Sequence, residues 1–125
     1  LFIDLDGLKQ INDNLGHEIG DRAIVDAARI LQQSCRDEDI IARLGGDEFV
    51  ILATSDLDNA ETIRDRLQAN IASFNQKSDR PYQLSMSIGI QCSLPQDNVA
   101  LETLLAQADE LMYTQKRNKK VNNSL

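Results

Sequence analysis

Hydrophobic and polar residues follow two periods along this chain, and the two periods separate predicted strands from predicted helices. The first five residues are apolar except for Asp4, as in a strand that is buried on both faces. Between residues 84 and 90, apolar residues alternate with serine or glycine, which is the clearest strand pattern in the sequence. Two more short strands are expected over residues 40–44 and 47–53, because the Gly45-Gly46 pair between them is typical of a hairpin turn.

Apolar side chains at intervals of three and four residues predict three helices. Asp21 suits the N-cap of the first helix, which is expected to end near Cys35. The preceding segment, residues 6–20, is rich in Gly, Asn and Asp, so we expect a turn or loop there that includes one helical turn.

The second predicted helix covers residues 60–74, and Asp58 with Glu61 resembles a capping box at its start. A loop around Pro95 then leads to the third helix, which is expected over residues 101–112. The order of elements is therefore strand, helix, strand, strand, helix, strand, helix.

The first six of these elements match the ferredoxin-like, or split βαβ, topology of the α+β class. In that topology the first strand is central and runs antiparallel to the third. The end of the first strand, which carries Asp4 and Asp6, is thus expected to meet the Gly45-Gly46 turn, Asp47 and Glu48.

Length and composition are those of one small globular domain: the chain has 125 residues, of which 42% are hydrophobic, and we expect residues 1–125 to form a single domain. No apolar run approaches the roughly 18 residues that a membrane helix requires, and no basic leader is present. The two cysteines, Cys35 and Cys92, are too few for a disulfide framework. We therefore expect a cytoplasmic location, either alone or as the cytoplasmic domain of a larger sensor protein.

The net charge of −7 comes from 13 Lys and Arg against 20 Asp and Glu, and four of the basic residues lie within residues 116–120. An acidic protein is a poor nonspecific partner for nucleic acid or for an anionic membrane, so we expect neither as a partner. An anionic ligand would need help from metal ions or from that local basic stretch.

The acidic residues expected to meet are Asp4, Asp6, Asp47 and Glu48. Neighbouring carboxylates repel unless a cation joins them, and their hard oxygen atoms suit Mg²⁺ or Mn²⁺. A pair of carboxylates that holds two metal ions is an arrangement used for in-line displacement at phosphorus. The structural alternative is a set of solvated acids at strand ends, although Asp4 interrupts an apolar strand.

Two further pairs have both a functional and a structural interpretation. The amide of Asn12 and the carboxylate of Asp21 together match the hydrogen-bonding edge of guanine, but the same residues suit a turn and a helix cap. Lys116 and Lys120 share a helix face and would grip a triphosphate, but a basic helix end is also favoured by the helix dipole.

Arg36 and Asp39 lie just before the predicted hairpin. An arginine fork binds phosphate or stacks on a guanine base. The alternative is a surface salt bridge, which contributes little to stability.

Together these segments resemble one family. The run Arg43-Leu-Gly-Gly-Asp-Glu-Phe is similar to the signature of GGDEF-domain diguanylate cyclases. Asp4-Leu-Asp-Gly-Leu-Lys-Gln-Ile-Asn-Asp, Gly16-His17 and Gly20-Asp21 stand at the family's spacing. Ser85-Met-Ser-Ile-Gly resembles the family's late strand, and Ala108-Asp-Glu-Leu-Met-Tyr resembles its last helix. The resemblance covers nearly the whole chain and implies a fold like that of nucleotidyl cyclases and polymerase palms.

The resemblance implies a metal-dependent enzyme that condenses two GTP molecules into cyclic di-GMP and releases two pyrophosphates. Two Mg²⁺ or Mn²⁺ ions per site, a homodimer for catalysis and inhibition by the cyclic di-GMP product are implied as well. Its metal ligands would be the Asp4 and Asp47 carboxylates and the Leu5 carbonyl. Asp47, with Glu48 beside it, would help to deprotonate the attacking 3′-hydroxyl group.

The resemblance also assigns the remaining site residues. Guanine recognition falls on Asn12 and Asp21, phosphate binding falls on Lys116 and Lys120, and Gly45 with Gly46 would leave room for the nucleotide. The inhibitory product site falls on Arg36 and Asp39, joined by Arg66 from the second predicted helix.

The sequence departs from the family pattern in a few places. It begins after the N-terminal helix and the Asp-x-Leu-Thr-Gly-Leu segment that the family usually carries, so we expect a trimmed domain or part of a longer protein. Lys119 stands where Gly is usual, and Lys120 where Arg is usual, which would weaken phosphate binding because lysine is a point charge rather than a fork. A catalytically weak module that binds GTP or cyclic di-GMP for regulation is the alternative function. Another cyclase or palm-type nucleotidyltransferase would share the topology.

Overall fold

The computed structural model describes residues 1–53, 57–93 and 97–123, apart from the side chains of residues 57, 58 and 120–123. Asp58 of the predicted capping box and Pro95 of the predicted loop lie outside this description. The helices and strands are β1 (Phe2–Leu5), α1 (Leu8–Leu15), α2 (His17–Ser34), β2 (Ile40–Arg43), β3 (Glu48–Leu52), α3 (Leu57–Lys77), β4 (Met86–Gly89) and α4 (Leu101–Asn123).

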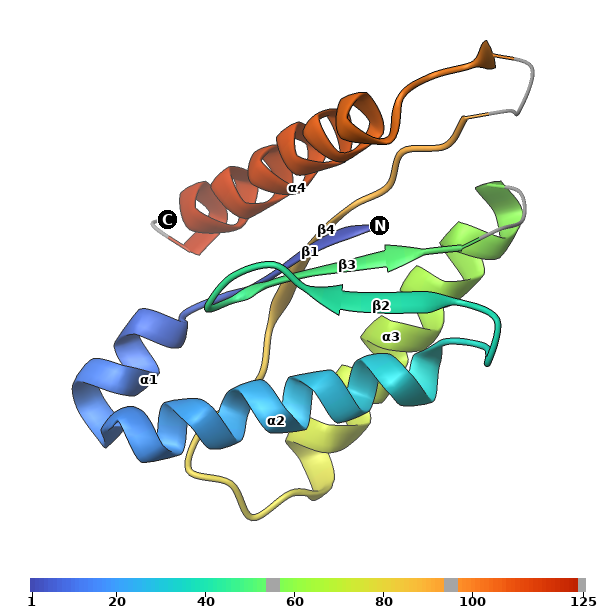
Figure 1. Ribbon diagram of the computed structural model, residues 1–125. Coiled ribbons are helices and arrows are strands. Elements are labelled where there is room, and N and C mark those ends of the chain that lie inside the picture. The colour runs from blue at the N-terminus through green and yellow to red at the C-terminus, as the bar shows by residue number, and fades with distance from the viewer. Residues whose placement is uncertain (54–56, 94–96, 124–125) are drawn as a thin grey trace.

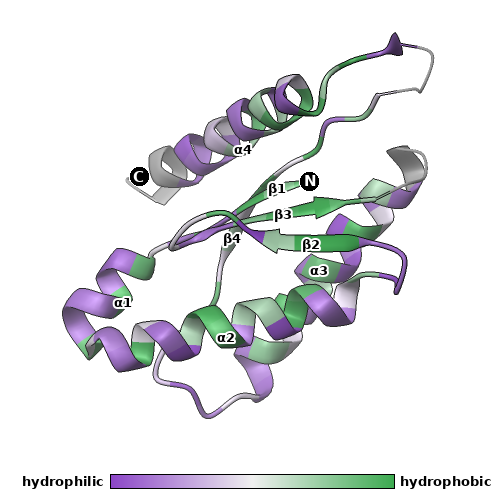
Figure 2. Ribbon diagram, in the orientation of Figure 1, coloured by the Kyte–Doolittle hydropathy of each residue, from purple (hydrophilic) through white to green (hydrophobic). Residues whose placement is uncertain are grey.

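The four described strands form one antiparallel sheet in the order β2-β3-β1-β4, so the predicted α+β fold and the central place of β1 are confirmed. Helices α2 and α3 cover one face of this sheet and α4 covers the other (Figure 1). The strands consist mostly of hydrophobic residues, whereas much of each helix consists of polar residues (Figure 2). None of the helices in the described ranges has the length and apolar character of a membrane span.

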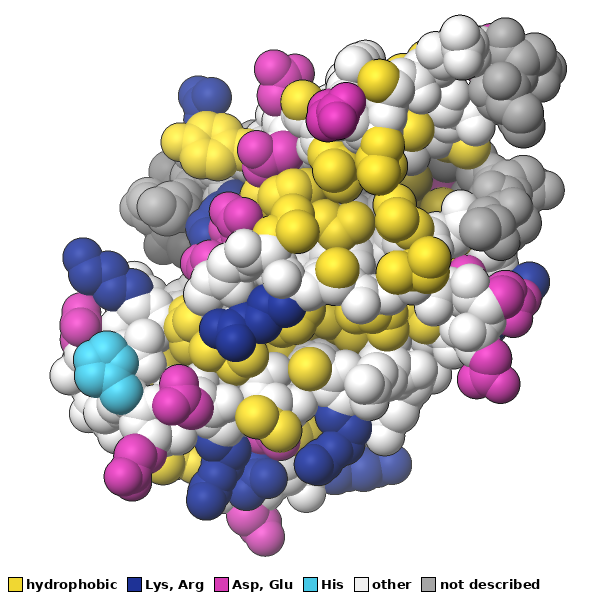
Figure 3. All heavy atoms as spheres, in the orientation of Figure 1, with side chains coloured by type: hydrophobic (Ala, Val, Ile, Leu, Met, Phe, Trp, Pro, Cys, Tyr) yellow, Lys and Arg dark blue, Asp and Glu magenta, His cyan; other side chains and the backbone are white. Residues whose placement is uncertain are grey.

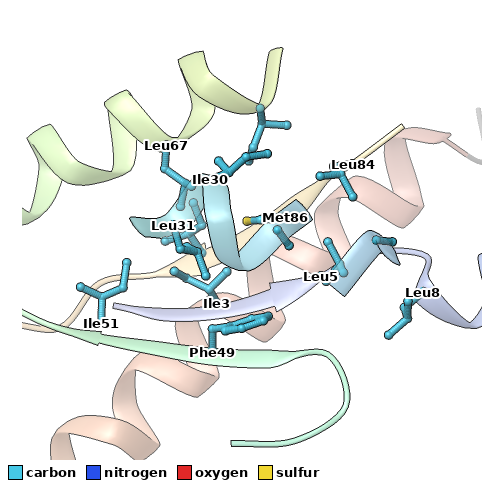
Figure 4. Close-up of a cluster of buried hydrophobic side chains, with 14 of the residues drawn as sticks. Ile3, Leu5, Leu8, Ile30, Leu31, Phe49, Ile51, Leu67, Leu84 and Met86 are labelled. Carbon is cyan, nitrogen blue, oxygen red and sulfur yellow. The ribbon is translucent and has the colours of Figure 1, made fainter. Parts of the chain in front are cut away.

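Strand β1 is buried on both faces, which explains its nearly continuous apolar sequence. Ile3 and Leu5 join a core cluster with residues of α2 and α3, as Figure 4 shows. Phe2 packs on the opposite face with Ala108 and Met112 of α4. Asp4 is therefore a carboxylate on a strand with no solvent-facing side, and only 7% of its surface is exposed.

The prediction of a loop over residues 6–20 is wrong. Two helices, α1 and α2, occupy most of it, separated at Gly16, whose φ of 92° is accessible mainly to glycine. Leu8 and Ile11 pack inward at helical spacing, while the Asn and Asp residues that suggested a loop lie largely on the outer side. Asp21 consequently lies inside α2 and does not cap it, since α2 begins at His17.

The sheet is open at its β2 edge. Helix α4 packs mainly over β4 and β1, and within the described part of the chain no helix packs closely on the same face of β2. Ile40 and Leu44 are 57% and 55% exposed there, and Figure 3 shows apolar side chains gathered between α4 and this edge.

The close approach of α4 to the sheet depends on Gly89 of β4. A Cβ atom at this position would collide with the Ala108 carbonyl oxygen and lie 2.5 Å from the Met112 nitrogen, and both are backbone atoms that cannot move aside singly. Glycine is thus required here for space rather than for its backbone angles.

We predict that Gly89→Ala lowers the free energy of unfolding by about 3 kcal/mol or more, because α4 must move away from the sheet. Urea titration followed by circular dichroism measures this loss. Gly46→Ala is the matched control, since a Cβ atom at Gly46 meets nothing within 4 Å. Equal stability of the two variants would contradict the packing argument.

Candidate functional site

The end of β1 meets the start of β3, as the topology predicted. Asp4 lies opposite Glu48 in the strand pairing, and the Leu5 amide donates to the Asp47 carbonyl oxygen over 2.8 Å. Residues 43 positions apart in the sequence are thus neighbours, and the prediction that these acids converge is confirmed for Asp4, Asp47 and Glu48.

Asp4 is a buried carboxylate that the surrounding protein satisfies only in part. Its Oδ2 accepts a hydrogen bond from Lys116 Nζ at 2.8 Å, but its buried Oδ1 has no partner. Burial raises the pKa of the Asp4 carboxyl to about 6; Lys116 opposes this shift and the Asp47 carboxylate adds to it. The pKa of Lys116 is raised, because Asp4 stabilises its charge more than burial disfavours it.

The pKa of Asp6 is shifted in the opposite direction from that of Asp4. Its Oδ2 accepts from Ser85 Oγ at 2.8 Å and from Lys119 Nζ at 3.0 Å, and its Oδ1 accepts from Ser87 Oγ at 2.8 Å. Burial alone would raise the pKa of Asp6, but these hydrogen bonds hold it below its usual range. Asp6 lines one cavity with Asp47, as the predicted convergence of the acids requires, but unlike Asp4 it has a hydrogen-bond partner on each carboxylate oxygen atom.

A cavity of about 480 Å³ opens beside these acids. Asp47, Lys116 and Lys119 line it, together with Asp6, Gly7, Leu8, Lys9, Gln10 and Ser85. Three lysines therefore face a space that could hold an anion. Sequence analysis assigned no role to Lys9, Lys119 or Ser85; Lys9 stands close in sequence to Asp6 and on that ground could have been considered.

The Gly45-Gly46 turn is closed by the side chain of Arg43. Its Nε donates to the Gly45 carbonyl oxygen at 2.9 Å and its Nη2 to the Gly46 carbonyl oxygen at 3.0 Å. The Glu48 carboxylate reaches back over the same turn, with Oε2 3.9 Å from where a Gly45 Cβ would stand. Both glycines are exposed and neither lines the cavity.

Asn12 of α1 and Asp21 of α2, the two residues expected to recognise guanine, lie close together. The Asn12 side-chain amide packs directly against Gly20, leaving no room for a Cβ atom at that position. Asp21 is the next residue and is exposed. Both lie outside the lining of the 480 Å³ cavity.

The three residues expected at the inhibitory product site meet at another corner. The Arg36 amide donates to Asp39 Oδ2 at 2.9 Å, and Arg66 Nη1 of α3 donates to the Ser34 carbonyl oxygen at 3.1 Å. Burial raises the pKa of the intervening Cys35 thiol to about 11, and Asp39 and Arg66 both act on it electrostatically. Arg66 thus binds the backbone two residues before Arg36, and the Arg36 guanidinium itself lies 3.9 Å from the Glu38 carboxylate.

Lys120 lies within α4, but its side chain is outside the described residues, so only Lys116 of the predicted lysine pair is placed in the site.

The residues that suit a divalent cation are Asp4 and Asp47, with the Leu5 carbonyl beside them. The unpartnered Oδ1 of buried Asp4 fits such an ion, which would supply the missing positive charge. Among the described residues, no set of three or more His, Cys, Asp or Glu side chains is arranged to hold a metal. An ion here would take its other ligands from water, backbone or phosphate oxygen atoms, as Mg²⁺ commonly does.

The chain resembles curated proteins over most of its length. The sequence profile described as "Diguanylate cyclase, GGDEF domain" matches residues 1–122. The bifunctional diguanylate cyclase/cyclic di-GMP phosphodiesterase MucR of Pseudomonas aeruginosa is 40% identical over 114 residues, 90% of this chain and 16% of that protein. Diguanylate cyclase TpbB of the same species is 38% identical over 120 residues, 94% of this chain and 27% of that protein. This chain therefore spans only a minor part of either relative.

Solved structures agree with the sequence matches. An EAL/GGDEF domain protein from M. capsulatus superposes with a TM-score of 0.80 at 37% identity, covering 94% of this chain and 76% of that one. The GGDEF domain of TpbB from Pseudomonas aeruginosa gives a TM-score of 0.77 at 38% identity, with 94% and 74% covered. Because sequence and three-dimensional structure match over nearly the same extent, this chain belongs to the GGDEF diguanylate cyclase domain family.

Proposed function

We propose that this domain is a diguanylate cyclase, which condenses two GTP molecules into cyclic di-GMP and releases two pyrophosphates. The observation that carries the proposal is the Asp4–Asp47 pair, which stands beside a cavity lined by three lysines in a chain with an intact signature. Acids for a cation and ammonium groups for a phosphate tail are the two requirements of phosphoryl transfer from a nucleotide.

Each bond forms when a 3′-hydroxyl oxygen attacks the α-phosphorus of a GTP, breaks its bond to the bridging oxygen and releases pyrophosphate. Asp47, with Glu48 next to it, accepts the hydroxyl proton. Lys116 and Lys120 bind the phosphate tail, and the exposed Gly45-Gly46 turn lets the nucleotide approach the backbone. Two Mg²⁺ or Mn²⁺ ions, when bound by Asp4, Asp47 and the Leu5 carbonyl, supply positive charge for the phosphate oxygens.

Catalysis requires two copies of the chain. One site offers a single GTP, and the product contains two nucleotides joined by two bonds, so two sites must face each other. Asn12 and Asp21 make the reaction selective for guanine, because an amide and a carboxylate together match that base's edge.

Product inhibition is assigned to the corner at the end of α2. Arg66 binds the Ser34 carbonyl oxygen two residues before Arg36, and in this proposal the two arginines offer positive charge to the two phosphates of cyclic di-GMP. Asp39, which already accepts the Arg36 amide, holds the turn in place.

We predict that Asp47→Ala lowers the rate of cyclic di-GMP formation by about a hundredfold or more, because a proton acceptor and a metal ligand are lost together. The rate is measured by chromatography of a dimeric preparation with GTP and Mg²⁺. The control is Asp79→Ala, which removes an exposed acid after α3 and should retain full activity. Wild-type protein that binds GTP without turnover would support the regulatory module instead.

Divalent-ion binding is expected to depend on pH through Asp4. Because the pKa of this carboxyl is raised to about 6, protons compete with the ion below pH 6, and the affinity should fall about tenfold for each pH unit there. Above about pH 7 the affinity should be constant. Mn²⁺ titration followed by electron paramagnetic resonance between pH 5 and pH 8 measures this profile.

Asp4→Asn is the companion variant and should weaken Mn²⁺ binding and flatten the profile. An affinity that does not change with pH in the wild type, or equal affinity in the two proteins, would refute the assignment of Asp4.

We predict that Arg36→Ala raises the cyclic di-GMP concentration for half-maximal inhibition by about tenfold or more, since a charged hydrogen bond to phosphate is lost. Initial rates at low product should not change. Arg64→Ala serves as the control, because Arg64 pairs with Asp65 on α3. Unaltered inhibition in Arg36→Ala would remove this corner from the inhibitory site.

A further inference from the structure

Helix α4 reaches the end of β1 through two lysines that share one of its faces. Lys116 pairs with Asp4 at 2.8 Å and Lys119 pairs with Asp6 at 3.0 Å. The spacing of three residues on the helix matches the spacing of two on the extended chain that leaves β1. The two ion pairs nevertheless differ in how completely the carboxylate is satisfied.

Both oxygen atoms of the Asp6 carboxylate accept hydrogen bonds from protein groups. Ser85 and Lys119 donate to one oxygen atom and Ser87 donates to the other. Asp4, by contrast, keeps one buried oxygen atom without a partner. Of these two aspartates, only Asp4 has a buried oxygen atom with no hydrogen-bond partner.

The ammonium group of Lys119 is also committed to the protein. It donates to Asp6 and to the backbone carbonyl oxygen of Met86, the first residue of β4. It therefore joins α4 to the end of β1 and the start of β4 at one point, and two of its three N–H groups are committed to these partners.

Lys116 lies between two residues of α4 whose side chains bond to the backbone of β4. On its N-terminal side, Gln115 Oε1 accepts from the Ile88 amide at 2.5 Å, and on its C-terminal side Lys119 makes the contacts described above. Two lysines of α4 thus line the cavity in different states. The ammonium group of Lys119 is fixed to the sheet, whereas that of Lys116 pairs with Asp4, which is also a candidate cation ligand.

We propose that Lys119 is a positioning residue for nucleotide binding: by clamping Asp6 it holds α4 so that Lys116 faces the phosphate tail, and it leaves Asp4 and Asp47 as the carboxylates open to a cation. This inference rests on the proposed function, because it takes the cavity to be the GTP site. Lys119 itself does not contact the phosphates.

A double-mutant cycle tests this role, with isothermal titration of a non-hydrolysable GTP analogue in the presence of Mg²⁺. Lys119→Met and Asp6→Asn should each weaken binding about tenfold, and the double variant should bind no more weakly than the worse single variant. The reason is that either change breaks the same clamp. Lys119→Arg, which keeps the charge and the reach to Asp6, should restore most of the affinity.

Arg117→Met is the matched control. Its guanidinium lies over the Tyr113 ring, 6.0 Å from the ring centre, so the variant loses a positive charge on the same helix without touching the cavity. Its affinity for the analogue should equal that of the wild type. A comparable loss in Arg117→Met would mean that overall charge, and not the clamp, governs binding.

Additive losses in Lys119→Met and Asp6→Asn would overturn the proposal, because they would mean that Lys119 binds phosphate directly. Amide hydrogen exchange in the nucleotide-free protein adds a measurement that needs neither turnover nor GTP. Exchange in α4 around Lys116 should speed up equally in the two single variants, and unchanged exchange would also overturn the proposal. If the wild-type protein made no cyclic di-GMP, the proposed enzyme function would be refuted. The measurements of analogue affinity and hydrogen exchange would still test the role of Lys119.

Discussion

A carboxylate on a strand that is buried on both faces requires compensating charge, and Asp4 imposes this requirement on the rest of the site. Neighbouring strands cannot meet it, because the residues opposite Asp4 are the uncharged Ser87 of β4 and another acid, Glu48 of β3. The charge comes instead from α4, a helix more than one hundred residues later in the sequence, through Lys116. One oxygen atom remains unsatisfied even so, which makes this pair receptive to a further cation.

The position of α4 is consequently as important to the site as the strands that carry the acids. Gly89 permits the helix to lie against β4, Gln115 bonds to the Ile88 amide, and Lys119 ties its C-terminal part to Asp6 and Met86. These contacts join packing to electrostatics, because a small shift of the helix would move the ammonium group of Lys116 away from Asp4. The same helix therefore completes the core and carries two of the three lysines that line the cavity.

Two aspartates that stand two residues apart have opposite surroundings. Asp4 points toward α4 from inside the sheet, where burial and Asp47 raise its pKa. Asp6 lies just beyond the strand, where two serines of the β4 region and Lys119 surround it and hold its pKa low. Nothing in the local sequence Asp4-Leu-Asp6 distinguishes the two, so their division of roles is a property of the assembled sheet and helix.

The sequence pattern determined the strands and the three longer helices, because hydrophobic periodicity is a local property. The order of these elements then indicated the fold class and the meeting of Asp4 with Asp47. The signature at residues 43–49 likewise indicated the family without coordinates. Pattern failed over residues 6–20, where a glycine with positive φ joins two helices whose outer faces are rich in the residues of loops. Tertiary structure alone decided which acid stays unsatisfied, that Arg66 reaches the end of α2, and that Lys119 clamps Asp6. Those contacts join residues between 32 and 113 positions apart, and their energies depend on burial and on partners that no local window contains.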